Sequence, residues 1–380
     1  MKIADCRRQG RVLSVRWADG RKDRFHLLWL RDNCLDPVNL DPETGERRVD
    51  FHTIPLDVDA EEITVSKDGG LTVTWSDLPL QTHYPADWLR AHAFDNSSTL
   101  AESAAIPEPE GWRFATVEEM PRFSYDAVLS EPSRELALLT AFRRYGIALI
   151  EGAPARAGIV EALTQRMGYL REVCFGRVRD LKTSLKADNV AFTSVDVKPH
   201  TDGSNYRWPY EVQFLHCMVQ GARGGDSYVV DGFAVAEALR RDDPAAFELL
   251  SRIRVAYKVG SGSFDVRHSG PVFDLDRDGN LRFVRYSNQQ RRVLEAALED
   301  IEPFYAAYHK LSAMMNDPAR QIAFRLRVGD VLMFDNHRVL HARTAFEAAS
   351  GIRHLQLATT DRDMVDSRVR ILQREQRQGT

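Results

Sequence analysis

The stretch Val331-Leu332-Met333-Phe334-Asp335-Asn336-His337-Arg338-Val339-Leu340-His341 joins a short apolar run to a polar segment that ends in a histidine. Short apolar runs of four to eight residues are typical of buried strands. Similar runs recur through the second half of the chain without helices between them, at Val255–Val259, Pro271–Leu275, Leu281–Tyr286, Ile322–Leu326 and Leu355–Thr359. Many short strands with a few helices outside them predict an antiparallel sandwich or jelly roll.

The rest of the chain predicts a second, smaller domain and a few helices. Residues 11–17 and 24–29 should pair as strands around a turn, and a second hairpin turns at Lys67–Gly70. The proline-containing segment 101–109 then separates a small β-rich domain at 1–100 from a larger domain at 112–380. In that domain we expect one helix from Ser133 to Gly146 and another that opens at the N-cap Asp243.

Composition limits the classes of partner. The formal charge of −4, from 51 basic and 55 acidic residues, provides no field that would gather nucleic acid or anionic membrane. No apolar stretch approaches the about 20 residues that span a bilayer. The four cysteines show no Cys-x-x-Cys spacing, and the amino terminus lacks the apolar run of a signal peptide. We therefore expect a cytoplasmic protein whose partners are small molecules or its own copies.

A metal site is indicated by two histidines and an aspartate. His200 and Asp202 are two positions apart, so on a strand both would point to the same face, and His341 could supply a third ligand. Such a triad leaves three positions of an iron open, enough for a 2-oxo acid and O₂. Arg353, twelve positions after His341, could bind the distal carboxylate of that acid. A lone His-x-Asp pair is more often solvated or structural, however.

Four segments together resemble the γ-butyrobetaine and trimethyllysine hydroxylase family of Fe(II)/2-oxoglutarate-dependent dioxygenases. They are His200-Thr201-Asp202, Val212–Cys217, Gly224–Phe233 with its Gly-Gly-Asp-Ser and Val-Asp-Gly-Phe strings, and Phe334–Arg343. The resemblance spans nearly the whole chain. It implies a double-stranded β-helix, Fe(II) on His200, Asp202 and His341, and O₂ as oxidant. It also implies a 2-oxoglutarate site with Arg353, Ser227 and Leu215, and a homodimer.

The amino-terminal domain is similar to that family's small extra domain but departs from it at the zinc site. Trp29–Cys34 and Tyr84–Leu89 carry the similarity. Relatives hold zinc with a Cys-x-Cys-x-x-Cys run and a later histidine, whereas this run reads Cys34-Leu35-Asp36-Pro37-Val38-Asn39 and the later position is Leu80. One thiolate beside Asp and Asn is a poor tetrahedral zinc site, so we expect no structural zinc.

The substrate pocket implied by the resemblance is also altered. Relatives surround a trimethylammonium group with aromatic rings, and the matching positions here are Phe175, Arg179, Phe192 and Gly203. An arginine in such a cage would repel a cation or attract an anion. Asn189, Tyr206, Asn288 and Arg285 are further candidates for substrate contact, although Tyr206 could equally pack in the core, as we expect of Trp208 and Tyr210.

The sequence therefore predicts hydroxylation of a C–H bond, coupled to conversion of 2-oxoglutarate to succinate and CO₂. The expected substrate is a small trimethylammonium compound with an acidic group, similar to γ-butyrobetaine or 2-(trimethylamino)ethylphosphonate. One alternative keeps the chemistry but takes an amino acid or another substrate without a quaternary amine. Another is a catalytically silent metal-binding sensor. A zinc hydrolase would give Arg353 no role and is disfavoured.

Overall fold

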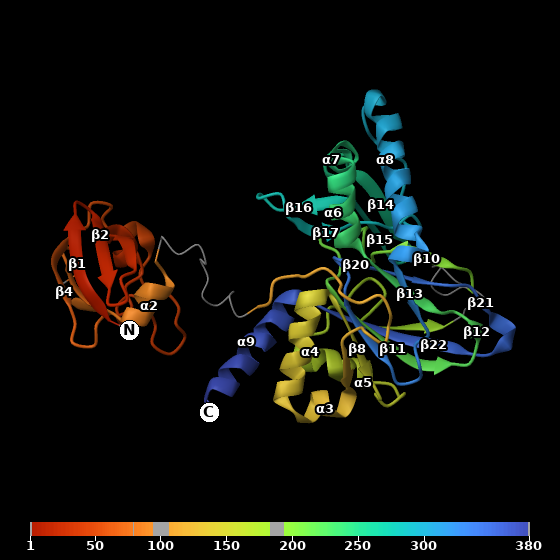
Figure 1. Cartoon of the computed structure of the whole chain (residues 1–380), viewed down its shortest axis with the longest axis horizontal. Helices are drawn as coiled ribbons and strands as arrows, with labels where there is room; N and C mark the ends of the chain where they lie inside the picture. Colours follow the sequence, from red (N-terminus) through yellow and green to blue (C-terminus); the bar gives the residue numbers. More distant parts are fainter. Residues whose placement is uncertain (1, 79, 94–105, 183–193, 379–380) are drawn as a thin grey trace. The chain divides into compact units, whose positions relative to one another are not determined.

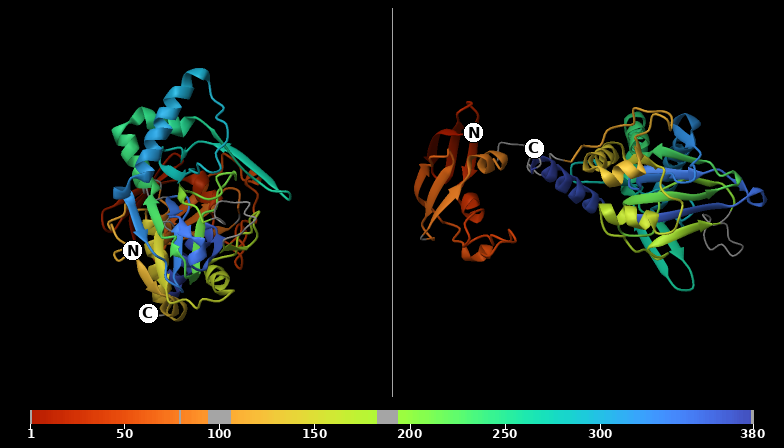
Figure 2. Two further views of the ribbon diagram at one scale, coloured as in Figure 1. Left: turned by 90° about the vertical axis from the view of Figure 1, so that its right-hand side faces the viewer. Right: turned by 90° about the horizontal axis from the view of Figure 1, so that it is seen from below.

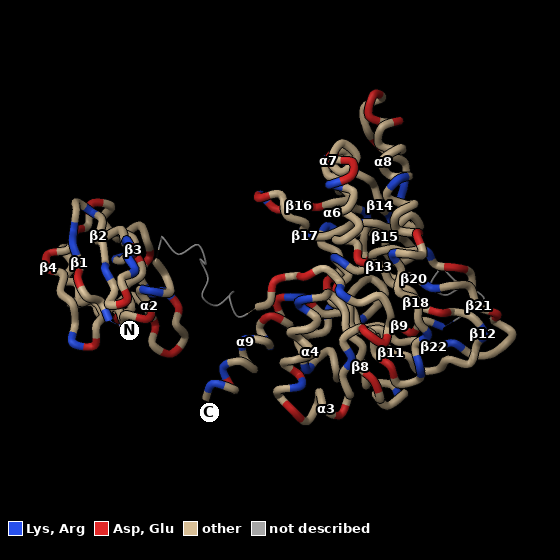
Figure 3. Tube along the Cα trace, viewed as in Figure 1, with Lys and Arg blue, Asp and Glu red and all other residues tan. Residues whose placement is uncertain are grey.

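The structure is a computed structural model that describes residues 2–78, 80–93, 106–182 and 194–378. The chain divides into two compact units, residues 1–105 and 106–380. Figure 3 shows basic and acidic residues interspersed along the traces of both units. Among the described helices, none combines the length and apolar character needed to cross a bilayer.

The first unit is built on two small antiparallel sheets (Figure 1). Its strands are β1 (Ile3–Gln9), β2 (Val12–Trp17), β3 (Lys22–His26), β4 (Ala60–Val65), β5 (Leu71–Trp75) and β6 (Gln81–Tyr84), with the helices α1 (Leu27–Asp32) and α2 (Ala86–Ala91) and the 3₁₀ turn Phe51–Thr53. The prediction that residues 24–29 form one strand was wrong, because α1 begins at Leu27. A continuous apolar run fits strand or helix, and here Leu27 and Leu30 are both buried by a helical turn.

The second unit contains two facing sheets. The larger has the order β7-β8-β19-β11-β22-β9 and the smaller β10-β20-β13-β18, with all pairs antiparallel except β7 with β8. Their bounds are β7 (Arg122–Ser124), β8 (Ile147–Glu151), β9 (Val178–Lys182), β10 (Val197–His200), β11 (Val212–Gln220), β13 (Ser227–Asp231), β18 (Gln321–Phe324), β19 (Val331–Asp335), β20 (Val339–Arg343) and β22 (Arg353–Thr360). Leu215 and Leu332 from one sheet share a core with Val229 and Ile322 from the other. The predicted double-stranded β-helix is confirmed.

Helices cover the outer face of the larger sheet (Figures 1 and 2). They are α3 (Tyr125–Ser130), α4 (Pro132–Tyr145), α5 (Ile159–Met167) and α9 (Arg362–Gln378). Phe142 of α4, Leu163 of α5 and Val369 of α9 pack with Phe214 and Met333 of the sheet. Gly146, with φ of 72°, ends α4 as predicted.

A long connection follows β13 and carries a second core. It contains α6 (Gly232–Asp242), α7 (Pro244–Arg252), β14 (Val255–Gly260), β15 (Asp265–Gly270), β16 (Phe273–Leu275), β17 (Leu281–Val284) and α8 (Leu298–Asn316). The helix predicted at Asp243 is confirmed, with the Asp243 side chain accepting from Ala246 N. The expectation of strands without intervening helices was wrong at α8, whose Phe304, Tyr308, Leu311 and Met315 lie at helical spacing and are buried. Short elements complete the unit: β12 (Arg223–Gly224), β21 (Phe346–Glu347), Pro318–Arg320 and Ala348–Ser350.

A polar network occupies the place in the first unit where the zinc-binding run would lie. The Cys34 Sγ is buried 3.4 Å from Thr82 Oγ1 and 3.2 Å from the Tyr84 hydroxyl. Thr82 donates to a carboxylate oxygen of Asp36 at 3.1 Å, and the Asn39 amide donates to both oxygens of Asp36 at 2.9 Å. His83 points elsewhere and pairs with Asp68 at 3.0 Å. Hydrogen bonds, in part through Thr82, thus connect Cys34, Asp36 and Asn39, the residues at three of the metal-ligand positions.

Candidate metal centre and substrate cavity

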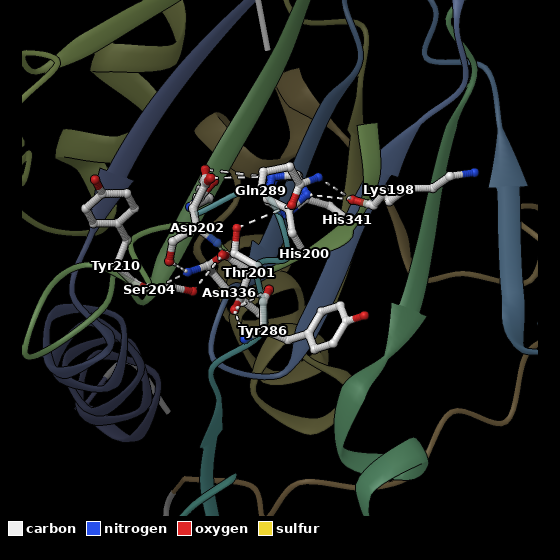
Figure 4. Close-up of polar contacts among 12 residues, drawn as sticks. Lys198, His200, Thr201, Asp202, Ser204, Tyr210, Tyr286, Gln289, Asn336 and His341 are labelled. Atoms are coloured by element: carbon white, nitrogen blue, oxygen red, sulfur yellow. Dashed lines mark hydrogen bonds and ion pairs between the residues drawn. The ribbon is translucent and has the colours of Figure 1, made fainter. Parts of the chain in front are cut away.

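Two paired strands bring the candidate metal ligands together. His200 ends β10 and lies directly opposite His341 of β20, and their rings are 4.3 Å apart (Figure 4). His200 Nε2 is 3.5 Å from Asp202 Oδ1, and His341 Nε2 is 3.9 Å from Asp202 Oδ2. One donor atom from each of the three residues lies within 4.8 Å of the others. Within the described ranges, no other group of three His, Cys, Asp or Glu side chains has such geometry.

Asp202 reaches this cluster from a turn, not from the strand that the sequence predicted. β10 ends at His200, and Gly203 follows Asp202 with φ of 71°. Thr201 N donates to the carbonyl of Tyr286 at 2.7 Å, and the Thr201 hydroxyl to that of Val284 at 3.0 Å. The backbone therefore leaves the β-ladder before Asp202, and the two hydrogen bonds of Thr201 fix the conformation of the turn.

The side chain of Asn336 fixes the backbone on which Asp202 stands (Figure 4). Asp202 N donates to Asn336 Oδ1 at 2.7 Å, and Asn336 Nδ2 donates to the carbonyls of Asp202 at 2.9 Å and Tyr210 at 2.8 Å. Gln213 Nε2 donates to Asp202 Oδ2 at 3.2 Å. A carboxylate held in this way is preorganised for binding.

The protonation states in the cluster suit a divalent metal. Burial alone would raise the pKa of Asp202, but the hydrogen bond from His200 and the charges around it hold that pKa well below its usual range. Burial first, then repulsion from His200, lower the pKa of His341 to about 3. His200 Nδ1 donates to the carbonyl of Lys198 at 2.9 Å, so Nε2 is the ring atom that faces Asp202. The donor set is thus one carboxylate and two imidazoles, which fits Fe(II).

A cavity of about 270 Å³ opens beside the cluster. Its walls include the three candidate ligands and the three residues predicted to bind 2-oxoglutarate, Leu215, Ser227 and Arg353. Arg353 is the first residue of β22, is buried, and lies with its guanidinium carbon 6.0 Å from the Phe346 ring. Burial first, then repulsion from Arg343, lower the pKa of Arg353 to about 10, so it stays charged at neutral pH. Its Nε has no hydrogen-bond partner among the described residues.

Arg179 lines the same cavity. The sequence alone did not decide whether this side chain faces the substrate pocket. On β9, Arg179 and Leu181 line the cavity, while Asp180 between them pairs with His354 on the other face. The Arg179 Nη2 atom is 3.7 Å from Asp202 Oδ2. Its guanidinium carbon lies 5.8 Å from the Phe175 ring and 5.4 Å from the Tyr210 ring.

Several of the other predicted substrate-binding residues are not found in the described walls of the cavity. Asn189 and Phe192 lie outside the described residues. Tyr206 and Asn288 are absent from the described walls of the cavity. The Tyr206 hydroxyl accepts from Cys174 N at 2.9 Å, and Asn288 is exposed and accepts from Arg291 at 3.4 Å. Their roles in substrate binding stay predictions.

Some functional positions were not predicted. Tyr210 was expected in the core; it is buried and also lines the cavity. Ser287, Gln289 and Gln290, the neighbours of Asn288 in sequence, line the cavity as well. Arg285, a candidate for substrate contact, is buried and donates to the carbonyls of Ser204 and Tyr206 at 2.7 Å. Gln213 and Asn336 stand inside the motif strings, and those strings were the only signal that could have indicated them.

The architecture and the His-Asp-His geometry define a class, that of the Fe(II)- and 2-oxoglutarate-dependent dioxygenases. Residues 108–359 match the model of the taurine catabolism dioxygenase TauD, TfdA family, and residues 4–90 match the γ-butyrobetaine hydroxylase-like N-terminal model. The chain belongs to the γ-butyrobetaine and trimethyllysine dioxygenase family within that class.

Curated relatives match both units. A γ-butyrobetaine dioxygenase of Pseudomonas sp. (strain AK-1) is 37% identical over 95% of this chain and 94% of its own length. The γ-butyrobetaine dioxygenase of Homo sapiens is 30% identical over 97% of this chain and 96% of its own. A trimethyllysine dioxygenase of Meyerozyma guilliermondii is 28% identical over 98% and 96%. This protein is accordingly a 2-oxoglutarate-dependent dioxygenase.

Proposed function

We propose that the protein hydroxylates a C–H bond of a small trimethylammonium substrate that carries an acidic group, while 2-oxoglutarate is converted to succinate and CO₂. The observation that carries this proposal is the 37% identity to a γ-butyrobetaine dioxygenase over 95% of the chain, combined with a His-Asp-His cluster at the wall of a cavity.

In this proposal His200, Asp202 and His341 hold Fe(II), and the ion with 2-oxoglutarate and O₂ supplies the oxidising power for the hydroxylation. The chain contributes binding and orientation. The hydrogen bond from His200 Nδ1 to the Lys198 carbonyl orients the ring so that Nε2 faces Asp202, and Asn336 keeps the Asp202 carboxylate in place.

Arg353, Ser227 and Leu215 form the proposed 2-oxoglutarate site. The buried guanidinium of Arg353 can receive the distal carboxylate in a charge-assisted bond, because its Nε lacks a partner among the described residues. Ser227, directly opposite Arg343 in the ladder, adds a hydroxyl, and Leu215 an apolar wall. The low polarity that lowers the pKa of Arg353 also strengthens a salt bridge formed there.

A second candidate function keeps the chemistry but takes a substrate without a quaternary amine. Arg179 favours it, because its guanidinium already lies near the faces of Phe175 and Tyr210. The expected cytoplasmic location and homodimer also stay predictions, as does the absence of nucleic-acid and membrane partners. Sedimentation of the purified protein would measure its oligomeric state.

Succinate release tests the proposal. The iron-loaded protein should release succinate with at least one of γ-butyrobetaine, trimethyllysine and 2-(trimethylamino)ethylphosphonate, and His341→Ala should abolish both this release and the weak visible band of Fe(II) bound to 2-oxoglutarate. If none of the three supports turnover while 2-oxoglutarate still decays without substrate, the trimethylammonium assignment fails and the second candidate gains. The complete absence of 2-oxoglutarate decay would instead favour a silent metal-binding sensor.

A further inference from the structure

We propose that Arg179 binds the anionic group of the primary substrate beside Asp202, so that the substrate enters with its acidic end at β9. This inference rests on the proposed function, because it assigns the orientation of a substrate in the same cavity. The assignment is carried by the guanidinium's neighbours, by its hydrogen bonding and by the separation of two cationic sites.

The aromatic faces next to Asp202 already have a cation beside them. The Arg179 guanidinium carbon is within 6 Å of both the Phe175 and the Tyr210 rings, the range in which a cation interacts with a ring face. A quaternary ammonium group would have to take these positions against a like charge. The part of the cavity between Phe175 and Tyr210 is therefore suited to a group of negative charge.

The Arg179 guanidinium also has a nitrogen, Nη2, that can donate further hydrogen bonds. Its side chain is only 10% exposed, and Nη2 makes no hydrogen bond within the described part of the chain. At 3.7 Å, the contact of Nη2 with Asp202 Oδ2 is an ion pair without a hydrogen bond. A metal ion on the Asp202 carboxylate would compensate the same negative charge, so the charge of Arg179 would be less compensated by Asp202. A buried donor of this kind is stabilised by an anionic partner.

The co-substrate does not need Arg179. Its proposed carboxylate partner is Arg353, the first residue of β22, whereas Arg179 stands opposite Leu357, four residues further along that strand, with its Nη2 3.7 Å from Asp202 Oδ2. The cavity thus offers two separate cationic places. One serves 2-oxoglutarate, and Arg179 remains for the second acid.

Calorimetric titration of the protein loaded with Mn(II) and 2-oxoglutarate under argon tests this inference without turnover. The probes are 2-(trimethylamino)ethylphosphonate, which has both charges, propylphosphonate, which has only the anion, and choline, which has only the cation. Wild type should bind both phosphonates more tightly than choline. In Arg179→Gln both phosphonates should bind at least about tenfold more weakly, while choline should not weaken.

Two variants separate the charge from general damage. Arg179→Lys should restore part of the phosphonate affinity, because it returns the charge without the planar fork. Arg277→Gln, at a side chain that is 93% exposed, should leave all three dissociation constants unchanged. The affinity for 2-oxoglutarate should be the same in Arg179→Gln and wild type.

Several results would overturn the inference. They are equal phosphonate affinity in wild type and Arg179→Gln, no measurable phosphonate binding by wild type, choline binding as tight as that of the phosphonates, or a weakened 2-oxoglutarate affinity in Arg179→Gln. The proposed function fails differently. If no trimethylammonium acid yields succinate but propylphosphonate binding still depends on Arg179, the anion site stands and the ammonium requirement falls.

Discussion

Asn336 and Asp202 form a reciprocal pair in which the side-chain amide of one bonds both the N–H and the carbonyl of the other, at 2.7 and 2.9 Å. Asn336 follows β19 in sequence, whereas Asp202 follows β10. The pair therefore connects the turn after β10 to the turn between β19 and β20. Because the backbone of Asp202 is held at both polar groups, its carboxylate can be aimed before any metal arrives.

Asn336→Ala should weaken Fe(II) binding by about 10- to 100-fold, the range typical of residues that orient a ligand. The reason is that Asp202 would lose both backbone partners while keeping its charge. Anaerobic Fe(II) titration measures the effect. Asn316→Ala is a matched control, because Asn316 also bonds a backbone carbonyl, that of Ser312 at 2.8 Å, but lies at the end of α8. Equal loss in both variants would mean that general destabilisation is the cause.

Arg353→Lys should raise the dissociation constant of 2-oxoglutarate on the order of tenfold or more and leave metal affinity unchanged. Lysine keeps a charge but cannot form the two parallel bonds of a guanidinium with a carboxylate. Calorimetry on the Mn(II)-loaded protein gives both constants. Arg223→Lys, at an exposed arginine that pairs with Glu347, is the control. Unchanged 2-oxoglutarate affinity would place the distal carboxylate elsewhere, with Arg343 the next residue to test.

The first unit should fold without zinc. Elemental analysis should find far less than one zinc per chain, and a chelator should leave the melting temperature unchanged. Thr82→Val should lower the free energy of unfolding by about 1–3 kcal/mol, because Asp36 loses a donor in a partly buried site. Thr72→Val on β5 is the control. Urea unfolding followed by tryptophan fluorescence is weighted toward this unit, which holds four of the six tryptophans, Trp17, Trp29, Trp75 and Trp88. One zinc per chain would refute the prediction.

Acid should destabilise the protein partly through His337. Burial, above all, lowers the pKa of His337 to about 3, whereas an unfolded histidine titrates near 6.5. The unfolded state therefore binds the extra proton, so this contribution to stability is complete above pH 6.5 and is lost as the pH falls toward 3. Its slope is at most about 1.4 kcal/mol per pH unit. His337→Gln should flatten the pH dependence of the urea midpoint between pH 6.5 and 4. A slope equal to that of wild type would contradict this.

The sequence predicted those parts of the fold whose signal is local. The apolar run at 331–334 and the Asp243-Pro244 helix start needed no tertiary information, and both were found. Residues 27–32 were assigned wrongly because an apolar run fits strand or helix alike. The helix α8 was missed although its buried residues lie at helical spacing.

In the candidate site, too, some residues could be predicted from the sequence and others depend on the folded structure. His200, Asp202 and His341 could be predicted because the motif strings carry them, and Arg353 because it lies twelve positions after His341; all four line one cavity. The direction of Arg179 could not, because it depends on the pairing of β9 with β22, which only the folded sheet sets. The same holds for Arg285, a candidate for substrate contact in the sequence, which is buried and donates to three backbone carbonyls.

The candidate iron-binding histidines come from the smaller sheet, on β10 and β20, whereas Arg179 comes from the larger one, on β9. The two histidines and the proposed anion-binding arginine thus stand on different sheets, although Arg353, proposed to bind 2-oxoglutarate, shares the larger sheet with Arg179. Mutations on β9 can accumulate without disturbing the pairing of His200 with His341. An oxygenase of this architecture could change its substrate specificity through substitutions on one strand while its reaction stayed the same. For protein engineering, β9 is accordingly the strand to randomise.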